Sequence, residues 1–223
     1  MNLVVSAPAA QRAAWSGVRV EIITVVWMLI EGAVAIGAGL AAHSLLLTAF
    51  GLDSGIELVA GGILLWRLRQ QAQQRALEQV ALAERRAAWV VAITLTLLCG
   101  YISASAALSV LTRHVPEISL PGLGIAALAV VGMPLLAWRK RQLARTLGSA
   151  ALRGDAACSL TCAAMAATLF LGLALTARFH WWWADSLMSL AFLGFLVPEA
   201  RAAWDGARQG RAACACGADD CDG

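Results

Sequence analysis

The chain has 223 residues, of which 60% are hydrophobic, and a formal net charge of only +3; its mean hydropathy is +0.72. This apolar content is well above the roughly 45–50% of soluble domains, so composition excludes an ordinary soluble fold. The basic residues are scattered over short segments between long apolar ones, which indicates bilayer-spanning helices and excludes a clustered nucleic-acid-binding face.

Residues 1–17 contain one arginine and no apolar run of signal-peptide length, so we expect an uncleaved cytoplasmic segment. Six apolar runs of spanning length follow, and they predict an all-α membrane protein with a six-helix transmembrane domain over 18–200. A short cytoplasmic tail, 201–223, completes the predicted organisation. The predicted spans are 20–42, 45–66, 87–111, 120–138, 150–176 and 181–198.

The connections between these spans alternate in charge. Segments 67–86 and 139–153 are rich in arginine, whereas 42–44, 113–121 and 178–180 are short and poor in cations. Placing both termini and the two basic connections in the cytoplasm puts fifteen of the seventeen Lys and Arg residues inside. The positive-inside rule therefore predicts an N-in, C-in topology.

The second span contains two acidic residues, Asp53 and Glu57, four positions apart. This spacing places both side chains on one helix face, about one turn from each other. A carboxylate in mid-membrane costs at least about 2.5–3.5 kcal/mol on insertion scales. No Lys or Arg of these spans is expected at that depth, so the pair must be neutralised by a proton, a metal ion, or each in turn.

The fifth span repeats the spacing with thiols, Cys158 and Cys162. At a rise of 1.5 Å per residue, Glu57 and Asp53 lie roughly 13 and 20 Å from the end of their span near Trp66. Counted from residue 150, Cys158 and Cys162 lie roughly 12 and 18 Å deep. The pairs are therefore expected to be level, Asp53 with Cys162 and Glu57 with Cys158.

Two carboxylates and two thiols from two helices predict a tetrahedral metal site, and thiolates favour a soft ion such as zinc or cadmium over magnesium or calcium. Two other interpretations stay open. The cysteines are small residues that also suit close helix packing. The acids are also compatible with a protonated, mutually hydrogen-bonded pair that serves structure alone.

Further acids and thiols lie outside these two pairs. Glu31 and Asp155 are candidates for proton acceptors, for groups that orient the ligands, or for ligands of an incoming ion. Asp155 is also close in sequence to Arg153, which suggests an interfacial ion pair as an alternative. The acidic tail carries three thiols that suit a soft cation, although a disordered end is an equal alternative. These tail cysteines are Cys214, Cys216 and Cys221.

Over residues 18–205 the sequence resembles the transmembrane domain of the cation diffusion facilitator family. Asp53-Ser-Gly-Ile-Glu57 resembles that family's ligand pair on the second helix, and Cys158-Ser-Leu-Thr-Cys162 occupies the place of the pair on the fifth. The segments Ala-Leu-Arg-Gly-Asp at 151–155 and Trp-Trp-Trp-Ala-Asp-Ser at 181–186 are also similar. The resemblance implies a six-helix bundle, a four-ligand site and proton-coupled export of divalent cations, usually by homodimers.

The chain departs from this family in two respects. Members usually carry His or Asp where Cys158 and Cys162 stand, so the cysteines indicate a softer ion. Most members also have a folded cytoplasmic domain after the sixth helix, where this chain has only a short tail.

These features predict a proton-coupled exporter of zinc or cadmium in a bacterial inner membrane. Its expected partners are the metal ion, protons and lipid, with a homodimer implied by the resemblance. We expect no enzymatic activity, no resident cofactor and no nucleic-acid partner. A membrane thiol oxidoreductase using Cys158 and Cys162, or a metal sensor that does not transport, are the alternatives. A C-x-x-x-C spacing on a continuous helix is a poor geometry for a disulfide.

Overall fold

The computed structural model of the chain describes residues 7–73, 78–112, 117, 119–147, 149–179 and 184–209. In this part of the chain all regular structure is α-helical, and all six helices are long and apolar enough to cross a bilayer. The predicted all-α, six-span class is therefore confirmed, while the N-in, C-in orientation stays a prediction. The helices are α1 (Ala7–Ala41), α2 (Leu45–Ala72), α3 (Glu78–Thr112), α4 (Leu120–Leu147), α5 (Ala150–Phe179) and α6 (Ala184–Arg208).

Several helices extend beyond the apolar runs that predicted them. Helix α2 continues to Ala72, α3 begins at Glu78 and α4 continues to Leu147, so most of the two basic connections is helical. These polar ends are rich in Ala, Leu, Gln and Arg, which are good helix formers. Hydropathy marks the part of a helix that suits lipid, and it does not mark where the helix ends.

Serine side chains cap three of the helices at their N-termini. Ser44 Oγ accepts a hydrogen bond from the Leu47 amide, and Ser119 and Ser149 do the same for amides at the starts of α4 and α5. Each cap satisfies one of the backbone donors that the first turn of a helix leaves unpaired. Short connections such as 42–44 therefore start the next helix without a longer loop.

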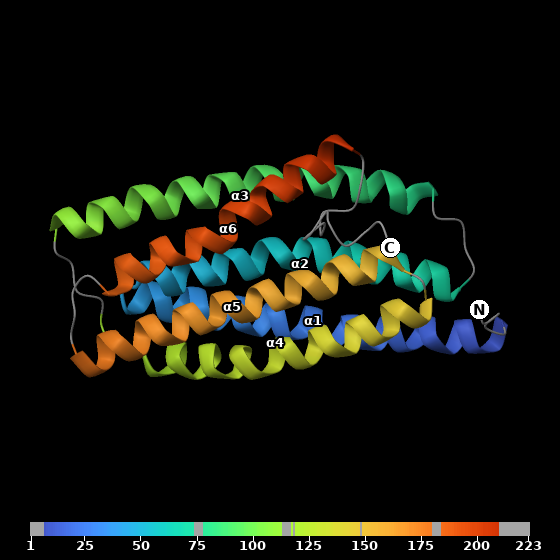
Figure 1. Ribbon diagram of the computed structural model, residues 1–223, viewed down its shortest axis with the longest axis horizontal. Helices are drawn as coiled ribbons and strands as arrows, with labels where there is room; N and C mark the ends of the chain where they lie inside the picture. Colours follow the sequence, from blue (N-terminus) through green and yellow to red (C-terminus); the bar gives the residue numbers. More distant parts are fainter. Residues whose placement is uncertain are drawn as a thin grey trace.

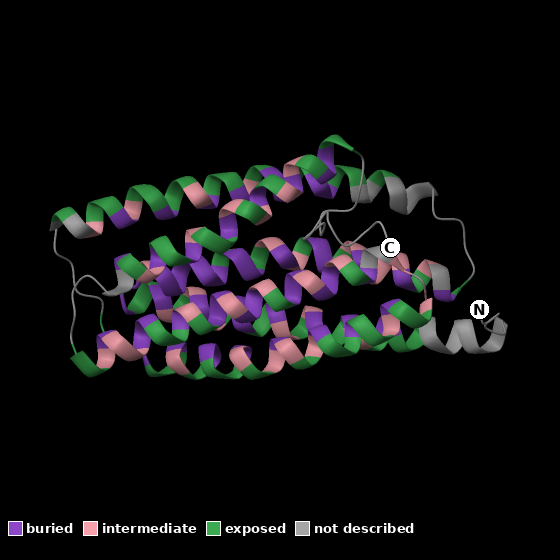
Figure 2. Ribbon diagram, in the orientation of Figure 1, coloured by how far each residue is buried: buried purple, intermediate pink, exposed green. Residues whose placement is uncertain are grey.

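Helix α2 is the centre of the bundle. It packs against α1, α3, α5 and α6, and 61% of its spanning segment is buried, against 33–44% in the other five. Helices α3 and α6 lie along one side of it, and α1, α4 and α5 lie along the other (Figure 1). Figure 2 shows buried residues concentrated on the inward faces and exposed ones on the outer faces of the bundle.

The contact between α1 and α2 depends on glycines. A Cβ added at Gly39 would lie 2.7 Å from the Thr48 backbone nitrogen, and one added at Gly51 would lie 2.7 Å from the Ile36 nitrogen. Small residues at these positions let the two backbones approach closely, as is common between helices in membranes. This contact fixes the part of α2 that carries Asp53.

Candidate metal centre

The central helix carries the two predicted acidic ligands on its buried face. Asp53 is 2% exposed and Glu57 is 7% exposed. They lie one turn apart on α2, as the four-residue spacing predicted. Asp53 Oδ1 is buried and has no hydrogen-bond partner among the residues that the structure describes, so this oxygen is available to a proton or a cation.

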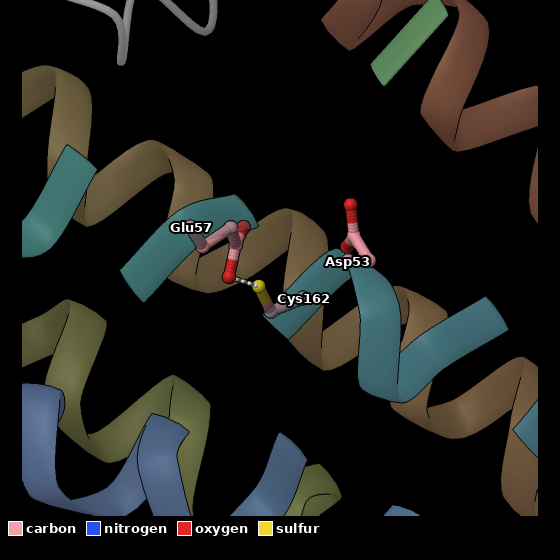
Figure 3. A group of neighbouring side chains, drawn as sticks. All are labelled: Asp53, Glu57 and Cys162. Carbon is pink, nitrogen blue, oxygen red and sulfur yellow. Dashed lines mark hydrogen bonds between the residues drawn. The ribbon is translucent and has the colours of Figure 1, made fainter. Parts of the chain in front are cut away.

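Helix α5 brings one thiol to these acids. Cys162 is 3% exposed, and its Sγ donates a hydrogen bond of 2.6 Å to Glu57 Oε2 (Figure 3). One ligand atom from each of Asp53, Glu57 and Cys162 lies within 4.8 Å of the other two. We call these three residues the ligand group. Two carboxylates and a thiol form a donor set suited to a divalent ion that accepts both oxygen and sulfur.

The second predicted thiol, Cys158, lies outside the ligand group. It is buried, with 4% of its surface exposed. The sequence predicted Glu57 level with Cys158, whereas the structure pairs Glu57 with Cys162, a difference of about one turn. The depth count started at Trp66, but α2 continues to Ala72. Glu57 is thus roughly 22 Å from the end of α2. Cys162 is roughly 18 Å and Cys158 roughly 12 Å from the start of α5, so Cys162 is closer in depth to Glu57.

A further buried acid lies beside the ligand group, on α1. Glu31 is fully buried, and its Oε1 accepts a hydrogen bond of 3.1 Å from Ser54 Oγ. Ser54 is the residue next to Asp53. Asp53 also interacts electrostatically with Glu31 and with Glu199 of α6. The site is therefore strongly acidic, and a bound cation would relieve repulsion among these carboxylates.

Asp155, the other acid singled out in the sequence, has a different partner from the one considered. It forms an ion pair with Lys140 of α4, and Lys140 also pairs with Glu21 of α1. The sequence predicted that segment 139–153, which contains Lys140, is a cytoplasmic connection. The sequence did indicate that Lys140 is unusual, because it is the single lysine among sixteen arginines.

The tail cysteines Cys214, Cys216 and Cys221 lie outside the described residues, so their role stays a prediction. The tryptophans at 181–183 and the side chain of Asp185 at the start of α6 also lie outside the described part of the structure.

Six apolar helices around a buried group of two carboxylates and a thiol define an integral, multi-pass membrane protein with a candidate cation site. The sequence matches the cation efflux transmembrane domain over residues 22–205, and the chain belongs to this family, the cation diffusion facilitators. Its members are transporters of metal cations and not enzymes, so this protein is a metal-cation efflux transporter. A search of curated proteins found no match.

Proposed function

We propose that this protein exports a soft divalent cation, zinc or cadmium, which it binds between Asp53, Glu57 and Cys162. The observation that supports this most strongly is the meeting of two buried carboxylates and a buried thiol from α2 and α5. Such charges are costly inside a membrane and mark ion pathways by default.

The thiol is the basis for a soft ion. Sulfur ligands favour zinc, cadmium and similar ions, whereas magnesium and calcium prefer oxygen alone. Three protein ligands leave a fourth tetrahedral position for water or for another side chain. Cys158, one turn away on α5, is the predicted fourth ligand and would enter the site after a small movement of α5.

The hydrogen bond between Cys162 and Glu57 supports the proposed proton exchange. The thiol is the donor, so it carries a proton that a metal ion must displace when it binds the sulfur. Binding therefore releases protons, and reprotonation from the opposite side would release the ion. Glu31, which neighbours Asp53 through Ser54, is the proposed proton acceptor at this site.

The proposal places the protein in a bacterial cytoplasmic membrane with both termini inside, as a homodimer. Fifteen of the seventeen basic residues lie on the inner side in this orientation. The homodimer rests on the family resemblance.

Proteoliposomes test the function. Vesicles that contain the wild-type protein should take up zinc and cadmium and release protons in exchange. Asp53→Asn should lower the flux of both ions at least about tenfold, because removing a ligand costs at least as much as the 10–100-fold loss seen for groups that support ligands. Flux is measured with the same protein density and metal gradient.

Thr161→Val is the matched control. Thr161 neighbours Cys162 on α5, and its hydroxyl donates a hydrogen bond to the Ala157 carbonyl of its own helix. This variant should transport at the wild-type rate. Wild-type flux through Asp53→Asn would contradict the assigned site. Metal binding without flux in the wild-type protein would favour the sensor over the transporter.

A further inference from the structure

A second buried charge cluster lies beyond Glu57, at the end of the ligand group that is farther from Asp53. Lys140 Nζ is 3.2 Å from Glu21 Oε2 and is in direct ion-pair contact with Asp155 Oδ2. The side chains of Lys140 and Glu21 are fully buried, and that of Asp155 is 5% exposed. We call these three residues the ion triad. It joins α1, α4 and α5.

The ion triad lies between the ligand group and one end of the bundle. A Cβ added at Gly61 of α2 would lie 3.1 Å from Glu21 Oε1, and Gly61 is one turn, about 6 Å along the helix, from Glu57. Ser159, which accepts a hydrogen bond of 3.3 Å from Lys140, is three residues from Cys162. Toward the end formed by the α4–α5 connection, an apolar cluster covers the triad. Its buried residues are Val18, Leu64, Leu68, Ala72, Ala144 and Leu152.

The ion triad holds two acids and one ammonium, so a proton or a second cation is needed to neutralise it. Among the described residues, Glu21 Oε1, which faces Gly61, has no hydrogen-bond partner. An unpaired buried carboxylate oxygen is costly in an apolar environment. The triad therefore has capacity for more positive charge on the side that faces Glu57.

The cation in the triad is also an unusual choice for this chain. Lys140 is its only lysine, whereas all sixteen other basic residues are arginine. An ammonium is a compact charge with three donors, unlike the planar guanidinium. It meets three oxygen atoms, from Glu21, Asp155 and Ser159. A cluster of carboxylate and hydroxyl oxygens around a small positive charge is also the environment of a bound metal cation.

We propose that Glu21 and Asp155 form a second, transient site for a divalent cation, in which the Lys140 ammonium is the resting occupant. An incoming ion displaces the ammonium, which leaves its ion pairs by rotation of its flexible stem. When the ammonium returns, it competes with the ion for the oxygens of this site. The ion then passes to the ligand group and its thiol. This extends the proposed function, because it adds a step before the ligand group, but it needs none of that group's ligands.

The single lysine makes this proposal testable in the wild-type protein. Purified protein in lipid nanodiscs is treated with formaldehyde and cyanoborohydride, and methylation of Lys140 is followed by peptide mass spectrometry. Zinc should raise the Lys140 rate at least about tenfold, since a displaced amine leaves its buried ion pairs. The α-amino group of the chain is the internal control, and its rate should not change. An unchanged or lower Lys140 rate with zinc would overturn the proposal.

A double variant separates this site from the ligand group. In Asp53→Asn/Cys162→Ser the zinc-dependent rise at Lys140 should persist, because Glu21 and Asp155 are intact. If the rise disappears there, zinc acts only through the ligand group and the second site is wrong. Metal flux can be lost in this variant while the Lys140 methylation rate still responds to zinc. The two proposals can therefore be refuted separately.

Metal stoichiometry provides an independent readout. Lys140→Met removes the resting occupant while keeping a long side chain, so this variant should bind one more equivalent of zinc than the wild type in equilibrium dialysis. Lys140→Met/Glu21→Gln should lose that extra equivalent. Equal stoichiometry in Lys140→Met and wild type, or an extra equivalent that survives Glu21→Gln, would contradict the assignment.

Discussion

Asp53 shows what a single residue contributes to the site. The residue is 2% exposed, its Oδ1 has no hydrogen-bond partner in the described part of the chain, and it interacts electrostatically with the acids Glu31 and Glu199. A group in this environment is stable only when a proton or cation neutralises it. Competition between the two for Asp53 is therefore the basis of the exchange that we propose at this site.

The two cysteines of α5 have different relations to these acids. Cys162 donates to Glu57, whereas Cys158, equally buried, lies outside the ligand group. The sequence could predict both thiols as candidates, because their spacing places them near one face. It could not predict which one meets Glu57, because that depends on how far α2 and α5 slide past each other.

Cobalt binding distinguishes the two thiols, in a chain whose tail cysteines Cys214, Cys216 and Cys221 are replaced by serine. Cobalt bound to a thiolate gives a near-ultraviolet charge-transfer absorption. We expect Cys162→Ser to remove more of this absorption than Cys158→Ser, because Cys162 is the thiol in the ligand group, whereas Cys158 must move to reach the ion. The reverse result would place Glu57 level with Cys158 and would show that the ligand group is wrong.

At the scale of the helices, the packing of α1 on α2 positions the acidic face. Gly39 and Gly51 are placed where any side chain would meet backbone of the partner helix. Helix starts at Ser44, Ser119 and Ser149 follow from ordinary capping preferences. Helix ends were less predictable, because α2 and α4 continue beyond their apolar runs into arginine-rich sequence.

Gly51→Ala should lower the thermal stability of the purified protein in detergent. The added Cβ would lie 2.7 Å from the Ile36 nitrogen, and overpacking of this kind typically costs about 1–3 kcal/mol. Gly55→Ala, one turn along α2, is the control, because nothing lies within 4 Å of its added Cβ. An equal fall in Tm for both variants would mean that the α1–α2 contact does not determine the effect, since helix propensity alone favours Ala over Gly.

At the scale of the whole molecule, the six-span bundle was predictable because bilayer thickness sets the length of apolar runs. The ion triad was not, because Glu21, Lys140 and Asp155 come from three helices whose rotations hydropathy does not define. Lys140 lies in the run Arg139–Arg141, where a surface position is the ordinary expectation for a charge. Only packing shows that its side chain points inward.

Transport through the bundle links the three scales, since in our proposal the ion passes the ligand group of α2 and α5. The most direct test is competitive flux of labelled cadmium and zinc through proteoliposomes that contain wild-type protein or Cys162→Ser. We predict that the cadmium-to-zinc flux ratio falls at least about tenfold in Cys162→Ser, because the thiol is the ligand that favours the softer ion. An unchanged ratio, with flux of both ions intact, would show that the transported ion does not contact Cys162.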